Sequence, residues 1–150
     1  MINKINRKIL LGSPCSIACV HGSDEYPDIC GTVSFFKACT GSLVMAEIFN
    51  LPSADGVFAM HIHNGNRCTG FEFADAGTHL NLSETEHPFH TGDLPALFSN
   101  NGYAWNTVFT NRFSPLQVKG FTVIVHEMPD DYHTQPSGNS GKKIACGVIK

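Results

Sequence analysis

The sequence lacks several features that would assign it to a common class of protein. It has no apolar run of the length that crosses a bilayer, which argues against a membrane-spanning helix. Its six cysteines form no CxxC pair, so a zinc ribbon is excluded. The formal net charge is −3, and three of the ten basic residues lie in the first eight positions. The rest of the chain is therefore acidic, which argues against binding to nucleic acid or to an anionic membrane.

The N-terminus also lacks a complete secretory signal. It is basic, but its apolar stretch ILLG is shorter than the hydrophobic region of a signal peptide. Two localisations stay open: the protein is cytoplasmic if this N-terminus is native, and exported if a leader has been removed. We expect residues 1–14 to form a flexible segment of a single domain that spans residues 1–150.

No stretch shows the amphipathic pattern of a full-length helix, and short alternating runs between turn signals predict an all-β fold instead. The expected strands are 16–21, 29–36, 43–49, 57–63, 94–98, 103–110, 121–126 and 143–149. Eight short strands favour a β-sandwich or flattened barrel. Trp105 and Phe109 are interpreted as packing residues, and Ser114 is expected to cap a single helical turn. The segments 64–92 and 127–141 are expected to be long functional loops.

Six of the eight histidines lie in or beside these two loops. They are His61, His63, His79, His87, His90 and His126. In the strand 57–63, alternation sends Met60 and Ile62 to one face and both histidines to the other, where two imidazoles can reach one ion. Any single histidine could be an ordinary surface residue, and we interpret the other two, His21 and His133, in this way. Six together indicate a metal site.

The donor types indicate two metals rather than one. Imidazoles from a strand pair and a distant strand suit copper or zinc. Within the first loop, three imidazoles and a carboxylate form a set typical of tetrahedral zinc, namely His79, His87, His90 and Asp93. The sequence therefore supplies more ligands than one metal can use, which predicts a two-metal site.

The motifs HIH, GTHLN, HPFHTGDLP, VIVHEMPDD and GNSGKKIACGVI, in this order, resemble those of the copper/zinc superoxide dismutase family. The resemblance extends from about Ser16 to the end of the chain. It implies an eight-stranded Greek-key β-sandwich, often dimeric, with the metals held outside it by two long loops. A homodimer is therefore one assembly left open for this chain.

The resemblance also implies roles for individual residues. Copper would be bound by His61, His63, His79 and His126. Zinc would be bound by His79, His87, His90 and Asp93, so His79 would touch both metals. Asp130 would hydrogen-bond one copper ligand and one zinc ligand, which fixes their ring orientation. Cys68 and Cys146 would form a disulfide between the metal loop and the last strand. The implied reaction converts two superoxide anions into dioxygen and hydrogen peroxide.

Three departures from the family pattern are visible. Lys143 replaces an arginine beside the copper, which keeps the charge but loses the planar donors that bind an anion and backbone carbonyls. Phe58 and Ala59 replace a histidine and a glycine before HIH, and Ala59 is expected to strain the backbone. The second loop is short and lacks steering charges, as in bacterial members.

The other four cysteines are Cys15, Cys19, Cys30 and Cys39. We expect one structural disulfide and buried free thiols, and we interpret Cys19 and Cys30 as unbonded neighbours across a hairpin. Two functions compete with the enzyme: a copper carrier without turnover, and a zinc-stabilised structural protein whose copper site stays empty.

Overall fold

The computed structural model describes residues 12–150, so most of the predicted segment 1–14 lies outside the described residues. Nine strands make up most of the regular structure: β1 (Ser16–Gly22), β2 (Cys30–Ala38), β3 (Gly41–Phe49), β4 (Val57–Phe58), β5 (Met60–His63), β6 (Leu97–Phe98), β7 (Ala104–Thr110), β8 (Thr122–His126) and β9 (Lys143–Val148). Among the described residues, no helix has the length and apolar character needed to cross a membrane.

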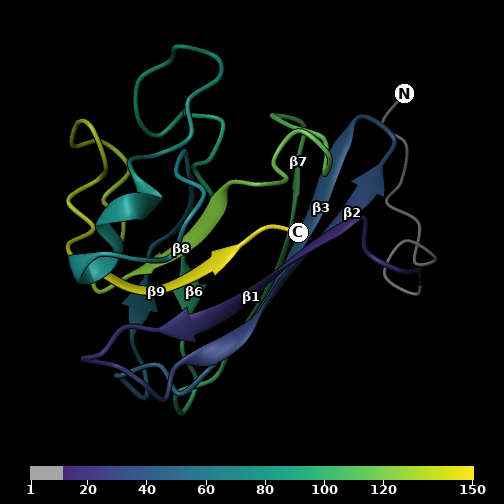
Figure 1. Cartoon of the computed structure of the whole chain (residues 1–150). Helices are drawn as coiled ribbons and strands as arrows, with labels where there is room; N and C mark the ends of the chain where they lie inside the picture. Colours follow the sequence, from purple (N-terminus) through teal and green to yellow (C-terminus); the bar gives the residue numbers. More distant parts are fainter. Residues whose placement is uncertain (1–11) are drawn as a thin grey trace.

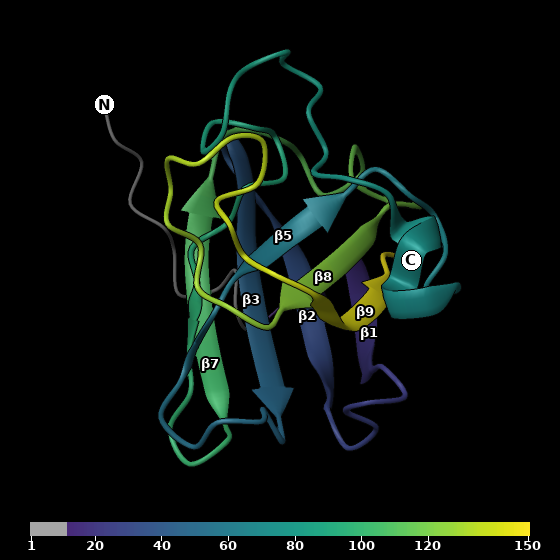
Figure 2. The same cartoon turned by 90° about the vertical axis from the view of Figure 1, so that its left-hand side faces the viewer.

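Seven strands form one antiparallel sheet in the order β5-β8-β9-β1-β2-β3-β7, and β4 pairs separately with β6. The sheet is curled into a half-barrel (Figure 1), and in Figure 2 the strands β5, β8 and β9 cross in front of β2 and β3. Strand alternation explains the core: along β1, Ala18 and Val20 are buried while Ile17 and Cys19 are exposed. The predicted all-β fold is confirmed.

One predicted strand, 57–63, is divided at Ala59. β4 turns away to pair with β6, while β5 pairs with β8. Between them, the Ala59 N–H donates to the Met128 carbonyl, and the Ala59 carbonyl accepts from the His126 N–H, both at 2.8–2.9 Å. Ala59 is not among the described residues with positive φ, so the expectation of backbone strain there was wrong. Phe58 is buried in the core.

The loops contain more local structure than predicted. The segment 64–92 includes a short 3₁₀ helix, η2 (Phe71–Ala76), which packs beside β9 (Figure 1). The predicted strand 94–98 is reduced to the two residues of β6. Residues 115–120 form turns, but the capping differs from the prediction: the Gln117 side-chain oxygen accepts from the Ser114 N–H at 2.8 Å.

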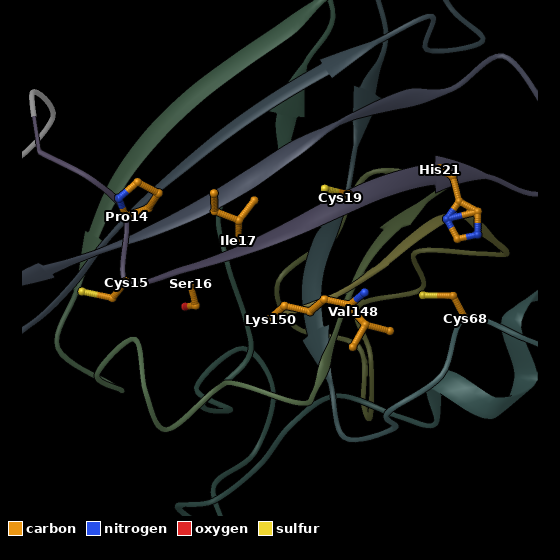
Figure 3. A pocket seen from close by; sticks show the side chains of 9 residues that line it. All are labelled: Pro14, Cys15, Ser16, Ile17, Cys19, His21, Cys68, Val148 and Lys150. Atoms are coloured by element: carbon orange, nitrogen blue, oxygen red, sulfur yellow. The ribbon is translucent and has the colours of Figure 1, made fainter.

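The cysteines follow the prediction in pairing but not in burial. Cys68 and Cys146 form the expected disulfide, which spans 78 residues of sequence and fixes the loop to β9. The free cysteines Cys15, Cys19, Cys30 and Cys39 are all exposed, so the expectation of buried thiols was wrong. Cys19 points outward because it alternates with buried Ala18 and Val20, and with Cys68 it lines a surface hollow of about 530 Å³ (Figure 3).

Trp105 and Phe109 also face outward. Their side chains are 53% and 39% exposed, whereas Ala104 on the same strand is 1% exposed. Interpreting them as packing residues was therefore wrong, because alternation indicates only that they share a face and not which face the core occupies.

Candidate metal centre

The backbone of β5 brings the distant histidines together. Two parts of the chain that follows β5 return to this strand, with one bridge between His63 and His79, in the middle of the loop 64–92, and another between His61 and Asp93, just after it. β8 lies on the other side of β5 and places His126 next to the same face. Residues that are far apart in the sequence therefore meet because main-chain hydrogen bonds hold the loop against one short strand.

Gly92 permits this close approach. The Ile62 N–H donates to the Gly92 carbonyl, and the Leu80 N–H donates to the Ile62 carbonyl, each at 2.8 Å. A Cβ atom on residue 92 would collide with the Ile62 carbonyl oxygen. Glycine is required here because two backbones share the space that a side chain would need.

The first cluster consists of four buried histidines whose donor atoms all lie within 4.8 Å of one another: His61, His63, His79 and His126. The Nδ1 atoms of His63 and His126 bond to the carbonyls of Gly77 (2.9 Å) and Gly141 (3.2 Å). A carbonyl can only accept, so each Nδ1 carries the proton and each Nε2 has a free lone pair. These two Nε2 atoms are 3.2 Å apart.

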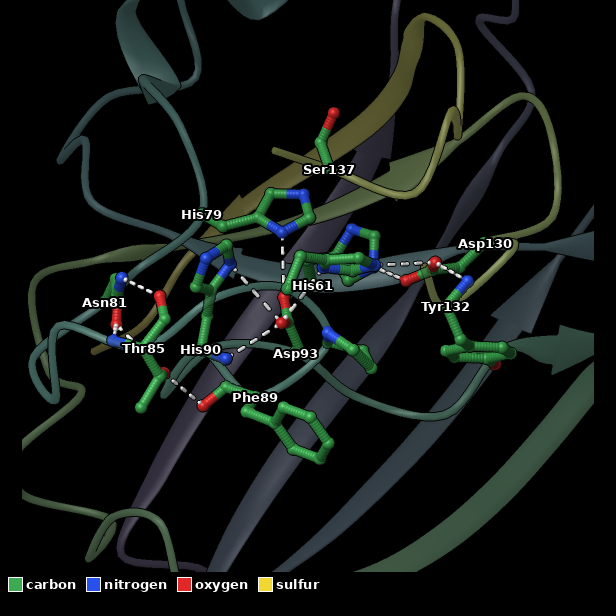
Figure 4. A network of polar contacts seen from close by, with 12 residues as sticks. His61, His79, Asn81, Thr85, Phe89, His90, Asp93, Asp130, Tyr132 and Ser137 are labelled. Carbon is green, nitrogen blue, oxygen red and sulfur yellow. Dashed lines mark hydrogen bonds and ion pairs between the residues drawn. The ribbon is translucent and has the colours of Figure 1, made fainter. Parts of the chain in front are cut away.

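The second cluster consists of His79, His87, His90 and Asp93, again within 4.8 Å. The distances from the Asp93 carboxylate to the three imidazole Nδ1 atoms are 2.7 Å for His79, 3.1 Å for His87 and 3.3 Å for His90. Figure 4 shows Asp93 between His79 and His90. Four donors at about 2.0 Å from a tetrahedral zinc ion are about 3.3 Å from one another. The cluster therefore has nearly the dimensions of a zinc site.

Several buried imidazole nitrogens have no hydrogen-bond partner. They are His61 Nδ1, His79 Nε2, His87 Nδ1 and His90 Nδ1. Unpaired buried polar atoms are costly and rare in proteins. Every one belongs to a cluster, and His79 belongs to both, with Nδ1 facing Asp93 and Nε2 unpaired. Bound metals would satisfy all four atoms, so the residues fit a two-metal centre.

Asp130 connects the two clusters. Its Oδ2 accepts from His61 Nε2 at 2.7 Å (Figure 4), and its Oδ1 accepts from His87 Nε2 at 2.8 Å. The backbone of Gly138 lies directly against this carboxylate. Gly138 has a positive φ of 68°, and a Cβ atom there would collide with Asp130. These contacts leave the Nδ1 atoms of both histidines free to bind metal.

The environment favours the neutral form of His61, His63 and His126 and the ionised form of Asp130. Burial lowers the pKa values of all three histidines. The pKa of His61 is lowered, that of His63 lies well below 6.5, and that of His126 falls to about 3. Burial alone would raise the pKa of Asp130, but hydrogen bonds from His61, the Tyr132 N–H and His87 lower it to about 2. Neutral imidazoles and ionised carboxylates are the forms that bind metals.

Gln135 is a site residue that the sequence analysis missed. Its Oε1 accepts from the His87 N–H at 3.1 Å, and its Nε2 donates to the His87 carbonyl at 2.7 Å. The second loop therefore holds the backbone of His87 while Asp130 holds its ring. A glutamine that bonds to main chain carries no recognisable sequence signal.

Lys143 lies beside the first cluster, where a β-bulge between Val125 and His126 alters the pairing of β8 with β9. Its Nζ donates to the carbonyls of Gly77 at 2.8 Å and Phe73 at 3.3 Å. Lysine lacks the planar fork of an arginine, but its ammonium group still reaches two backbone carbonyls. Lys143 lines a cavity of about 470 Å³ together with His63, His79, His90 and His126. Partial burial lowers the pKa of the lysine.

The fold and the site together define a class of protein: an antiparallel β-barrel with two histidine-rich groups of metal-binding side chains that share one residue. The family model for copper/zinc superoxide dismutase matches residues 29–149. The chain therefore belongs to the copper/zinc superoxide dismutase family, which confirms the resemblance seen in the sequence.

Individual relatives agree with this assignment. The chain is 35% identical to a Cu-Zn superoxide dismutase of Actinobacillus pleuropneumoniae over 80% of this chain and 72% of that one. It is 30% identical to superoxide dismutase [Cu-Zn] 1 of Aquifex aeolicus, over 80% and 79% of the respective chains. The solved Cu/Zn superoxide dismutase of Brucella abortus superposes with a TM-score of 0.78 at 26% identity, covering 90% of this chain and 99% of that one.

The connection through Asp130 can be tested with asparagine, which offers one acceptor oxygen in place of two. We expect Asp130→Asn to weaken metal binding to the folded protein by about 10- to 100-fold, because His61 or His87 loses its orienting acceptor. Competition with a chelator measures this change. Asp55→Asn, at an exposed position, is the control and should match the wild type. Unchanged affinity in Asp130→Asn would show that the carboxylate does not orient the ligands.

Proposed function

We propose that the protein is a superoxide dismutase with copper in the first cluster and zinc in the second. The observation that carries this proposal is the shared position of His79, whose two ring nitrogens are directed to different clusters. Membership of the copper/zinc superoxide dismutase family supports it. The proposed copper ligands are His61, His63, His79 and His126, and the proposed zinc ligands are His79, His87, His90 and Asp93.

Bound copper supplies a one-electron couple, so that one superoxide is oxidised to dioxygen while a second superoxide, with two protons, is reduced to hydrogen peroxide. Zinc has no redox chemistry of its own and suits a site that is closed by four protein ligands. The proposed division of roles follows from the donor sets, since the second cluster contains a carboxylate and the first contains only imidazoles.

The residues around the first cluster supply the rest of the chemistry. His79 Nε2 can hold a proton when it is not bound to metal, which places a proton donor within the cavity. Lys143 provides a positive charge beside His126, where a small anion would enter. Its bonds to the Gly77 and Phe73 carbonyls hold this charge in place.

The two rival functions have less support. A copper carrier needs accessible ligands for transfer, whereas His61, His63, His79 and His126 are each at most 7% exposed. A purely zinc-stabilised protein gains nothing from the three further histidines that the second cluster does not use. The enzyme is the function that employs both clusters.

The enzymatic proposal is tested by measuring metal content and superoxide consumption together. We expect His126→Ala to lower activity by more than about 100-fold, because a ligand to copper is removed, and to retain zinc, because His126 is not part of the second cluster. His133→Ala removes an exposed histidine and should behave like the wild type. Equal activity in His126→Ala, or no activity in copper-loaded wild type, would contradict the proposal.

Electrostatic attraction by Lys143 is tested by varying ionic strength. We expect Lys143→Glu to slow superoxide consumption about 10-fold at low salt, because a charge that attracts the anion is replaced by one that repels it. The difference should shrink in 0.15 M salt, where the Debye length is about 8 Å. Lys119→Glu makes the same charge change at an exposed position away from the cavity. An equal effect of both variants would show that only net charge matters.

A further inference from the structure

Arg112 lies two residues beyond the end of β7 and contacts the loop that carries the second cluster. Its Nη1 atom is 3.1 Å from the Pro88 carbonyl oxygen, 3.0 Å from that of His90 and 3.1 Å from that of Asp93. All three carbonyls belong to the segment 87–93, HPFHTGD. The sequence analysis gave Arg112 no role, because a main-chain contact between distant segments leaves no motif.

The three carbonyls point to one place, which is unfavourable unless a cation lies there. Each carbonyl oxygen carries a partial negative charge, so three converging oxygens repel one another. The guanidinium group of Arg112 compensates this charge and accepts no bonds itself. Removing it would leave the three peptide groups without the partner that favours their present orientation.

Two of these peptide groups belong to residues of the second cluster. His90 and Asp93 direct their side chains into the cluster, and the His90 N–H also donates to Asp93 Oδ2 at 3.0 Å. Their carbonyls are directed outward to Arg112. Because the orientation of a peptide group is coupled to the direction of the adjacent side chains, holding the carbonyls also restricts where the ligand atoms lie.

The other end of the segment is held by different groups. Gln135 bonds to the backbone of His87, and Asp130 bonds to its ring. Arg112 acts on the side of His90 and Asp93, from a connection between strands that contributes no residue to either cluster. The segment is therefore held from two directions by side chains outside the donor set.

We propose that Arg112 is a positioning residue for zinc: it holds His90 and Asp93 in their ligand geometry before the metal arrives. This inference rests on the proposed zinc site. We therefore expect the loss of Arg112 to lower the affinity for Zn²⁺ more than it lowers the stability of the metal-free fold, because a preformed site loses less conformational freedom on binding.

The test compares Arg112→Gln and Arg112→Lys with Arg67→Gln, which removes an exposed arginine whose side chain makes no hydrogen bond or ion pair with another residue of the described range 12–150. Zn²⁺ affinity is measured by competition with a chelator, and Co²⁺ in the second cluster reports ligand geometry through its absorption spectrum. Thermal unfolding of the metal-free variants measures stability separately. We expect Zn²⁺ affinity to fall about 10- to 100-fold in Arg112→Gln and less in Arg112→Lys, whose ammonium group keeps the charge.

The outcomes separate the positioning role from its alternatives. A changed Co²⁺ spectrum and weaker Zn²⁺ binding in Arg112→Gln, with Arg67→Gln like the wild type, support the inference. Lower stability of metal-free Arg112→Gln with unchanged Zn²⁺ affinity overturns it, because Arg112 then serves only the fold. If the wild type itself binds no Zn²⁺, the proposed zinc site fails and this inference fails with it.

Discussion

His79 belongs to both clusters of metal-binding side chains, so the surrounding structure must fix the position of its ring with respect to both sites. One imidazole ring can serve two sites only if its position is fixed to a fraction of an ångström on both sides. The bridge to His63 fixes the backbone of His79, and the Asp93 carboxylate lies 2.7 Å from its Nδ1. Gly92 allows the returning loop to lie close enough for that contact.

The holding contacts form a shell around the donors. Asp130 orients one ring in each cluster, Gln135 holds the backbone of His87, and Arg112 bonds to the carbonyls of His90 and Asp93. The Cys68–Cys146 disulfide fixes the start of the same loop to β9. The loop buries only a few apolar side chains, among them Phe73 and Leu80, so hydrogen bonds and a covalent link add to the order that this burial provides.

The sequence predicted the parts of the molecule that depend on residue type and local spacing. Alternation along the strands gave the all-β fold and placed His61 and His63 on one face, and the histidine clusters met as expected. The sequence could not show that β5 begins after Ala59, because this depends on main-chain hydrogen bonds between Ala59 and the distant residues Met128 and His126. Nor could alternation decide that Trp105 faces solvent, because both faces of a strand have the same period.

The residues that hold the donors were the least predictable. Arg112 and Gln135 bond to main-chain groups, which every residue possesses, so no pattern in the sequence distinguishes them from other polar loop residues. The loss of the planar fork expected at Lys143 did not indicate that its ammonium group would reach two backbone carbonyls. Such contacts become visible only when the path of both loops is known.

Magnetic coupling between ions bound in the two clusters tests most directly whether His79 joins the two metals. Cu²⁺ is placed in the first cluster and Co²⁺ replaces zinc in the second, and the Cu²⁺ electron paramagnetic resonance signal is recorded. A shared imidazolate couples the two ions, so we expect the Cu²⁺ signal to be strongly diminished relative to the copper/zinc protein. A Cu²⁺ signal of unchanged intensity and shape, with both ions shown to be bound, would contradict it.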